Sequence, residues 1–182
     1  PHGGHYYYSD GTWSPDAKTI TGNPILGVVY KVNADGTGKV VSPTEQTGLK
    51  WGPKDVTTGA TSTTIGKENT DMIFTKVSEG TYTLSDYPIF NACKELRTST
   101  GNNGWYIPIL PEYSDLFKVA STINNKITAI SGTTLFIPSD YTDGYWTSTE
   151  VSSNTANLMM SDYSAGAINK DRSHRVRFML EF

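Results

Sequence analysis

Residues 175–182 read Arg-Val-Arg-Phe-Met-Leu-Glu-Phe, and their apolar side chains recur at every second position. That spacing is typical of a β-strand, in which successive side chains point to opposite faces. One face carries Val176, Phe178, Leu180 and Phe182, and the other carries Arg175, Arg177 and Glu181. We therefore predict a closing strand with one buried face.

Further β-patterned segments precede this strand. They are Tyr145 to Glu150, Ala156 to Met160 and Ala167 to Asn169 in the last third, and 6–13, 25–32 and 39–41 in the first. Asp10-Gly11 and Asp35-Gly36 lie between apolar runs and predict two hairpin turns. Pro43 is expected to end the strand that begins at Lys39, because proline cannot donate to the ladder.

Two helices are predicted between these groups of strands. Ile89, Ala92, Cys93 and Leu96 recur at helical spacing, after Pro88 in a first-turn position. A second helix is expected from Pro111 to about Lys126 or Ile127, with one apolar stripe. The Thr- and Gly-rich stretch 44–80 is interpreted as mostly irregular loop. This order of elements predicts an α+β fold, with two helices packed on a largely antiparallel twisted sheet.

Length and composition fit one domain over residues 1–182, with residues 1–5 expected to be a disordered or vector-derived end. The formal net charge of −3 is spread without runs, which argues against nucleic acid as a partner. An apolar run near ~20 residues is missing from the sequence, so direct membrane insertion is not expected. An upstream leader or domain and the oligomeric state are left open.

Residue constellations for catalysis or metal binding are sparse, so we expect no enzyme, no cofactor and no metal site. Cys93 is the one cysteine, and its helical phase favours a small buried core side chain over a nucleophile. His2 and His5 are far along the sequence from His174. The four tryptophans could stack on sugars, but Trp105 and Trp146 lie among apolar strand residues and are interpreted as core.

Three motifs in order carry a resemblance to a known family. They are Gly104-Trp105-Tyr106-x-Pro108, Tyr145-Trp146-x-Ser148-Thr149-Glu150 and Arg175-Val176-Arg177. Together with segments 7–14, 26–30 and 90–96, the chain resembles DUF1566-like (Fib_succ_major/Lcl-type) bacterial surface proteins. The resemblance implies a C-type-lectin fold of the formylglycine-generating-enzyme type. Phage receptor-binding proteins, adhesins and the variable proteins of diversity-generating retroelements also use this scaffold.

In those variable proteins the diversified window lies between the second and third motifs, which here is Val151 to Ser173. The resemblance therefore implies a non-enzymatic binding domain, extracellular on a cell surface or virion, whose partner is a protein or glycan receptor. The candidate ligand-binding residues are Asn154, Thr155, Asn157, Met159, Ser161, Asp162, Tyr163, Ser164, Asn169, Asp171 and Ser173. The chain departs from formylglycine-generating enzymes, which need two reactive cysteines, and from calcium-dependent lectins, whose Glu-Pro-Asn and Trp-Asn-Asp motifs are missing.

Two alternatives remain open at the level of the sequence. The chain could be a structural surface or pilus-associated domain, with residues 161–173 forming only a solvated loop. It could also be a hydrolase that uses loop carboxylates such as Asp140, Asp143 or Glu150 across a cleft.

Overall fold

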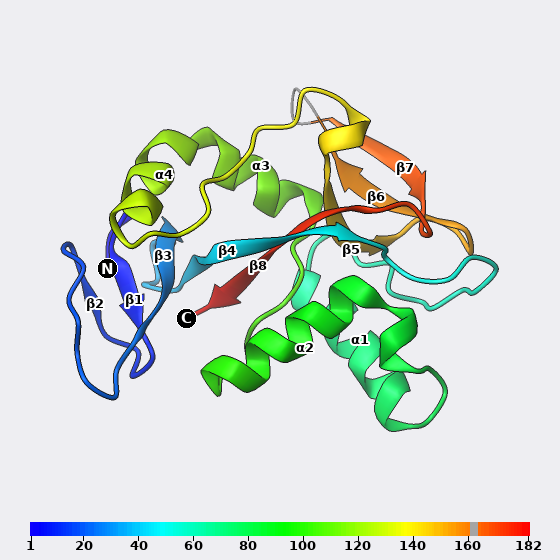
Figure 1. Cartoon of the computed structure of the whole chain (residues 1–182), viewed down its shortest axis with the longest axis horizontal. Helices are drawn as coiled ribbons and strands as arrows, with labels where there is room; N and C mark the ends of the chain where they lie inside the picture. The colour runs from blue at the N-terminus through cyan, green and yellow to red at the C-terminus, as the bar shows by residue number, and fades with distance from the viewer. Residues whose placement is uncertain (161–163) are drawn as a thin grey trace.

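The computed structural model describes residues 1–160 and 164–182. Within these residues it contains four α-helices and a mostly antiparallel sheet of eight strands, in the order β2-β1-β3-β4-β8-β5-β6-β7 (Figure 1). The strands are β1 Tyr6–Tyr8, β2 Trp13–Ser14, β3 Ile25–Val32, β4 Gly38–Leu49, β5 Tyr145–Glu150, β6 Thr155–Met159, β7 Ala165–Asn169 and β8 His174–Glu181. Among the described pairings, β5 and β8 are parallel and the rest are antiparallel. The α+β class is therefore confirmed.

Both predicted hairpins are present in the first half of the sheet. β1 pairs with β2 across Asp10-Gly11, and β3 pairs with β4 across Asp35-Gly36. The expectation that Pro43 ends its strand is wrong, since β4 continues to Leu49. The β4–β8 register shifts between Val41 and Glu45, so Pro43 lies in an irregularity where the ladder does not need its missing N–H.

The structure corrects the predicted number of helices from two to four. The helices are α1 Gly66–Ser78, α2 Pro88–Thr100, α3 Leu110–Lys118 and α4 Ala120–Ala129. The second predicted helix is divided at Val119, whose φ of −115° and ψ of 15° are not helical. Its apolar stripe continues across the break, which is why periodicity alone indicated one helix.

Helix α1 falls in the stretch interpreted as loop, because polar contacts anchor it to the protein. Its buried residues are Gly66, Asn69, Thr70 and Ile73, of which Ile73 alone has a large apolar side chain. The Asn69 side chain accepts from the N–H of Ser62 and donates to its carbonyl, both at 2.8 Å. The Ile107 N–H donates to Thr70 Oγ1 at 3.0 Å. Because α1 is held mainly by polar contacts, its sequence carries no continuous apolar stripe from which a helix could be predicted.

The two faces of the sheet are covered by different helices, which creates two cores. Figure 1 shows α1 and α2 on one side and α3 and α4 on the other. The first core holds Ile73 of α1 and Cys93 of α2, with Trp51, Trp105 and Trp146. The second holds Leu116 and Phe117 of α3 and Ile123 and Ile127 of α4, with Tyr113 and Met179. The core assignments of Trp105, Trp146 and Cys93 are confirmed, and burial raises the pKa of the Cys93 thiol to about 12.

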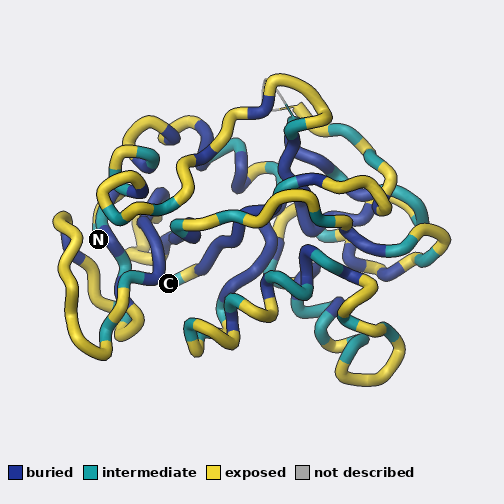
Figure 2. Tube along the Cα trace, in the orientation of Figure 1, coloured by how far each residue is buried: buried dark blue, intermediate teal, exposed yellow. Residues whose placement is uncertain are grey.

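Strand β8 lies in the middle of this sheet, and the prediction of one buried face is too simple. Figure 2 shows buried residues along most of the strand. Val176, Phe178 and Leu180 enter the first core as expected, but Met179 enters the second and Arg177 is fully buried. The buried guanidinium of Arg177 is paired there, because it donates to Glu45 Oε1 at 2.8 Å and to the Ser42 carbonyl at 2.9 Å.

The first residues of the chain are held against the sheet. The buried Gly4 donates its N–H to the Val29 carbonyl at 2.7 Å, and the Val29 N–H donates to the His5 carbonyl at 2.8 Å. These bonds extend the β1–β3 pairing by two residues. The expectation of a disordered end therefore does not describe Gly4 and His5.

Candidate functional site

The predicted recognition window is anchored at both ends by neighbouring strands. β5 precedes Val151 and β8 follows Ser173, and these strands pair through Tyr145 and Arg175. Between them the chain makes the β6–β7 hairpin, and β7 is the edge of the sheet. The window therefore begins and ends at two adjacent strands of the sheet, β5 and β8.

Residues within the window have different environments, and four of the described ones, Ala156, Leu158, Met159 and Lys170, are fully buried. Met159 is fully buried in the second core, so its assignment as a ligand contact is wrong. Alternation along β6 directs its side chain toward Tyr113 and Phe117 instead of solvent. Lys170 is also fully buried, and its ammonium donates to Glu150 Oε2 at 2.6 Å and to the Val56 carbonyl at 2.8 Å.

The carboxylate of this buried pair, Glu150, accepts hydrogen bonds at both of its oxygens. Glu150 Oε2 accepts from the Thr58 N–H at 2.9 Å and from Thr58 Oγ1 at 2.8 Å, and Oε1 accepts from the Gly59 N–H at 3.2 Å. Burial raises the carboxyl pKa, but the bonds from Lys170, Thr58 and Gly59 outweigh it, and the pKa lies below its usual value. The pair therefore fastens the end of β7 to the loop before α1.

Asn154, Thr155 and Asp171 lie at the two turns of this unit. Asn154 Oδ1 accepts from the Asp55 N–H at 2.7 Å. Thr155 Oγ1 lies 2.8 Å from Ser152 Oγ. Asp171 is exposed, 3.9 Å from the ammonium of Lys54. These residues hold turns in place and remain partly or fully accessible.

Asn157 lies on the opposite face of the hairpin from Ile168. It pairs with Ala167 across the β6–β7 ladder, so Ile168, one residue along, points the other way. Asn157 lines a cavity of about 190 Å³ with Thr63, Leu110, Pro111 and Thr149. The predicted contact residues therefore do not form one patch.

Four further predicted contacts are Ser161, Asp162, Tyr163 and Ser164. Ser161, Asp162 and Tyr163 lie outside the described residues. Ser164 is exposed, and its carbonyl accepts from the Met160 N–H at 2.8 Å.

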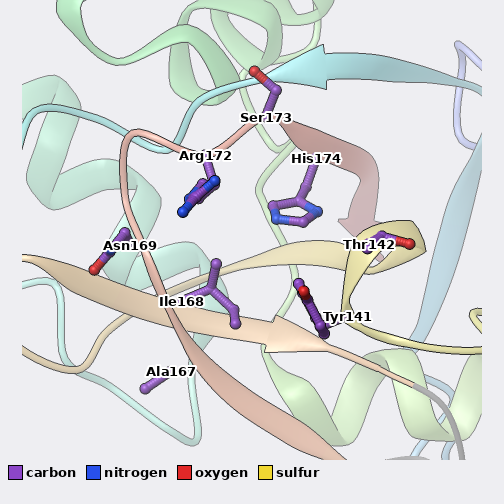
Figure 3. A pocket seen from close by; sticks show the side chains of 8 residues that line it. All are labelled: Tyr141, Thr142, Ala167, Ile168, Asn169, Arg172, Ser173 and His174. Carbon is purple, nitrogen blue, oxygen red and sulfur yellow. The ribbon is translucent and has the colours of Figure 1, made fainter.

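The last two predicted contacts, Asn169 and Ser173, meet at a larger cavity of about 510 Å³. It is lined by Tyr141, Thr142, Ala167, Ile168, Asn169, Arg172, Ser173 and His174. Figure 3 shows Arg172, His174, Ile168 and Tyr141 arranged around one space, with Asn169 and Thr142 on opposite sides. We take this cavity, the β7–β8 pocket, as the candidate functional site.

His174 forms the buried wall of the β7–β8 pocket. Its exposed fraction is 8%, and its ring meets the Trp146 ring edge-on with centroids 5.2 Å apart. The imidazole hydrogen-bonds the Thr142 backbone, while Nδ1 is buried without a partner among the described residues. Burial and the nearby Arg172 lower the His174 pKa, against the opposing effect of the Thr142 backbone bond. The ring is therefore neutral at pH 7.

The other walls are polar and accessible. Asn169, Arg172 and Ser173 are exposed, and the described residues provide no carboxylate partner for the Arg172 side chain. Tyr141, in a short 3₁₀ turn at Tyr141–Asp143, is 58% exposed. Asp140 precedes this turn and caps it by accepting from the Thr142 N–H and Oγ1, which lowers the Asp140 pKa.

Sequence reasoning missed Tyr141, Thr142 and His174 as pocket residues. His174 is in phase with Val176 and Phe178, so the alternation of β8 already indicated an inward side chain. Tyr141 lies in the polar run Ser139-Asp140-Tyr141-Thr142-Asp143-Gly144, where a large aromatic residue has no core to enter. Their proximity depends on β7 and β8 crossing beside this turn, which spacing in the sequence does not indicate.

The described residues offer few side-chain arrangements suited to catalysis or metal binding. In residues 1–160 and 164–182, groups of three or more His, Cys, Asp or Glu side chains that could hold a metal ion are absent. Glu150 is buried against Lys170, and Asp140 and Asp143 bond to Thr142 and Ser139 and do not line the pocket. The same described residues contain no helix with both the length and the apolar character to span a bilayer.

Comparison with known proteins gives a structural likeness and no sequence family. Protein-family models do not match the chain, and a search of curated proteins finds no match. A fimbrial protein from Bacteroides ovatus ATCC 8483, known from a crystal structure, superposes with a TM-score of 0.79 at 21% sequence identity. The alignment covers 100% of this chain and 49% of that protein. The chain thus shares the fold of about half of the fimbrial protein.

Proposed function

We propose that this chain is a non-enzymatic ligand-binding domain displayed at a cell surface, with the β7–β8 pocket as its recognition site. The observation that carries the proposal is the meeting of Asn169 and Ser173, both from the predicted window, at an open cavity with His174 on its wall. Pockets of about 300–1,000 Å³ with a few convergent polar groups are typical ligand sites. The cavity of about 510 Å³ falls within that range.

The organisation of the window supports a binding role. The core residues of β5 and β8 stay buried, whereas most of the described hairpin and turn positions between them are partly or fully accessible. Side chains in such a segment can change without loss of the core, and scaffolds of this kind commonly carry binding sites. The fold likeness to a fimbrial protein supports a surface location.

The C-type-lectin fold and the kinship with DUF1566-like proteins are part of this proposal. Their support is the order of strands, helices and strands, and the adjacency of the Tyr-Trp-x-Ser-Thr-Glu strand and the Arg-Val-Arg strand. Diversification of residues 151–173 rests on the resemblance alone. A near-copy of their codons beside a reverse-transcriptase gene would establish it, and a locus without such a copy would leave a binder of fixed specificity.

The test is a binding screen of the labelled domain against bacterial and host cells and against arrays of glycans and surface proteins. The double variant Asn169→Ala/Ser173→Ala removes two polar groups from the pocket and is expected to weaken a specific interaction at least about tenfold. Asn157→Ala is the matched control, because Asn157 lines a separate cavity and is not among the residues that line the β7–β8 pocket. Equal binding by all three proteins would contradict the proposal.

A structural, pilus-associated role is the second candidate, and the fimbrial neighbour favours it. In that case the domain is a building block, and the pocket has no ligand of its own. Polymer assembly by a chain with the pocket variants would then proceed at the wild-type level, while cell binding by the isolated domain would be absent.

A further inference from the structure

The β7–β8 pocket contains one hydrogen-bonding position that the described protein leaves empty. His174 Nδ1 is shielded from solvent, and it has no partner among the described atoms. Because the ring already bonds the Thr142 backbone, Nδ1 in the neutral imidazole is an acceptor that awaits a donor. A buried polar group without a partner costs free energy, and a ligand that supplies a hydroxyl would recover it.

The remaining polar wall offers both donors and acceptors. The Arg172 guanidinium, the Asn169 amide and the Ser173 hydroxyl all belong to side chains that are exposed at the cavity. A ligand that suits both sets of groups must carry several oxygen atoms that accept and donate. A row of neighbouring hydroxyl groups meets that requirement.

Tyr141 adds an apolar surface to the same cavity. Its ring is 58% exposed and lines the pocket opposite Arg172 (Figure 3). The Ile168 side chain and the Ala167 methyl group extend this surface along β7. A ligand with one apolar face and polar edges fits such walls, because the face can lie on the tyrosine ring while the edges reach the donors.

The charges around the pocket disfavour a small inorganic anion. Arg172 is the cation of the wall, but Asp140 and Asp143 flank Tyr141 and Thr142 in the adjoining turn. Asp140 accepts from Thr142, and Asp143 accepts from Ser139 at 3.2 Å. Asp171 precedes Arg172 in the chain, and its carboxylate lies 3.9 Å from the Lys54 ammonium. The mixture of signs suits a neutral ligand better than a phosphate or a sulfate.

We infer that the β7–β8 pocket binds one sugar unit of a glycan without a metal ion, stacked on Tyr141 and hydrogen-bonded to Arg172, Asn169 and His174. This assignment rests on the proposed function and gives its ligand a chemical class. The cavity of about 510 Å³ accommodates a monosaccharide with room for the linkage to the next unit. Access to Nδ1 requires a rotamer change at the pocket surface, a movement common at binding sites.

The experiment uses the full chain and methyl glycosides of glucose, galactose, mannose, fucose and N-acetylglucosamine. Saturation-transfer NMR in the presence of a metal chelator detects binding, and competition for cell attachment gives its relevance. Tyr141→Ala is expected to weaken the best glycoside at least about tenfold, the loss of roughly 1.4 kcal/mol of stacking. His174→Phe keeps a ring against Trp146 and removes the acceptor, with a similar expected loss.

Trp13→Ala is the control, because Trp13 is also an exposed aromatic residue but lies on β2, at the other edge of the sheet. It should bind the glycoside as the wild type does. Binding that needs calcium, or losses equal in Tyr141→Ala and Trp13→Ala, would overturn the inference.

Failure of the inference is distinguishable from failure of the proposed function. Cell attachment that depends on Asn169 and Ser173 but is inhibited by none of the glycosides, with no NMR signal, means that the ligand is not a sugar and that the binding role stands. Absence of attachment to every cell and array overturns both.

Discussion

Replacing Lys170 by methionine removes a fully buried ammonium and leaves the Glu150 carboxylate buried at 4% exposure. Three donor groups remain on that carboxylate, the Thr58 N–H and hydroxyl and the Gly59 N–H, but its neutralising charge at 2.6 Å is lost. Removal of one partner of a buried ion pair costs about 3–5 kcal/mol. The Trp51 ring, 4.8 Å from the ammonium, gains an apolar neighbour and returns little of this.

The assay is urea unfolding followed by tryptophan fluorescence at pH 7, with calorimetry beside it. At this chain length the loss corresponds to a fall in Tm of about 6–20 °C. Lys54→Met is the control, since Lys54 is an exposed lysine 3.9 Å from Asp171, and it should change stability by less than about 0.5 kcal/mol.

A double variant separates the charge from the packing. Glu150→Gln combined with Lys170→Met removes both charges and should be more stable than Lys170→Met alone by about 2 kcal/mol. The reasoning is refuted if Lys170→Met costs less than about 1 kcal/mol. It is also refuted if the losses of the two single variants simply add.

Three further perturbations test other parts of the structure. The buried His174 has a lowered pKa in the folded state, so its contribution to stability is full above the unfolded pKa of about 6.5 and is lost as pH falls below it. His174→Gln should flatten the decline in unfolding free energy between pH 7.5 and 5, and an unchanged slope would contradict this. Asn69→Ala should destabilise the protein by about 2 kcal/mol in urea, because both bonds to Ser62 are lost, whereas the exposed Thr75→Ala on the same helix should be near neutral. Gly27→Ala places a Cβ 2.2 Å from the Val41 carbonyl oxygen and should destabilise the protein by about 3 kcal/mol. Gly3→Ala is the control, because its Cβ meets open space and should leave stability unchanged. Equal Tm values for the two variants would refute the packing argument.

The fold was predictable from the sequence where local pattern and burial agree. Alternation identified β8, turn glycines identified both hairpins, and helical spacing identified α2. Helix α1 was not predictable in this way, because Asn69 and Thr70 secure it through hydrogen bonds that leave no apolar period. The burial of Arg177 was hidden for a related reason, since its partner Glu45 lies 132 residues away in the sequence.

The candidate site was predictable only in outline. The window contains Asn169 and Ser173, which do line the β7–β8 pocket, but also Met159 and Lys170, which are interior. Composition cannot separate these cases, because the phase of each strand against two cores decides which side chains reach solvent. Tyr141 lines the pocket from a turn that precedes β5, outside the predicted window of residues 151–173.

The central place of β8 has a consequence for how the chain reaches its native state. The last strand of the sequence inserts between β4 and β5, so the two halves of the sheet are joined to each other through residues 174–181. Contacts between segments more than a hundred residues apart form late and slow folding. A chain emerging from a ribosome or a translocation pore can thus form local hairpins and helices but no closed sheet until β8 appears. Completion of the sheet consequently waits for residues 174–181, after every other strand of this domain has been made.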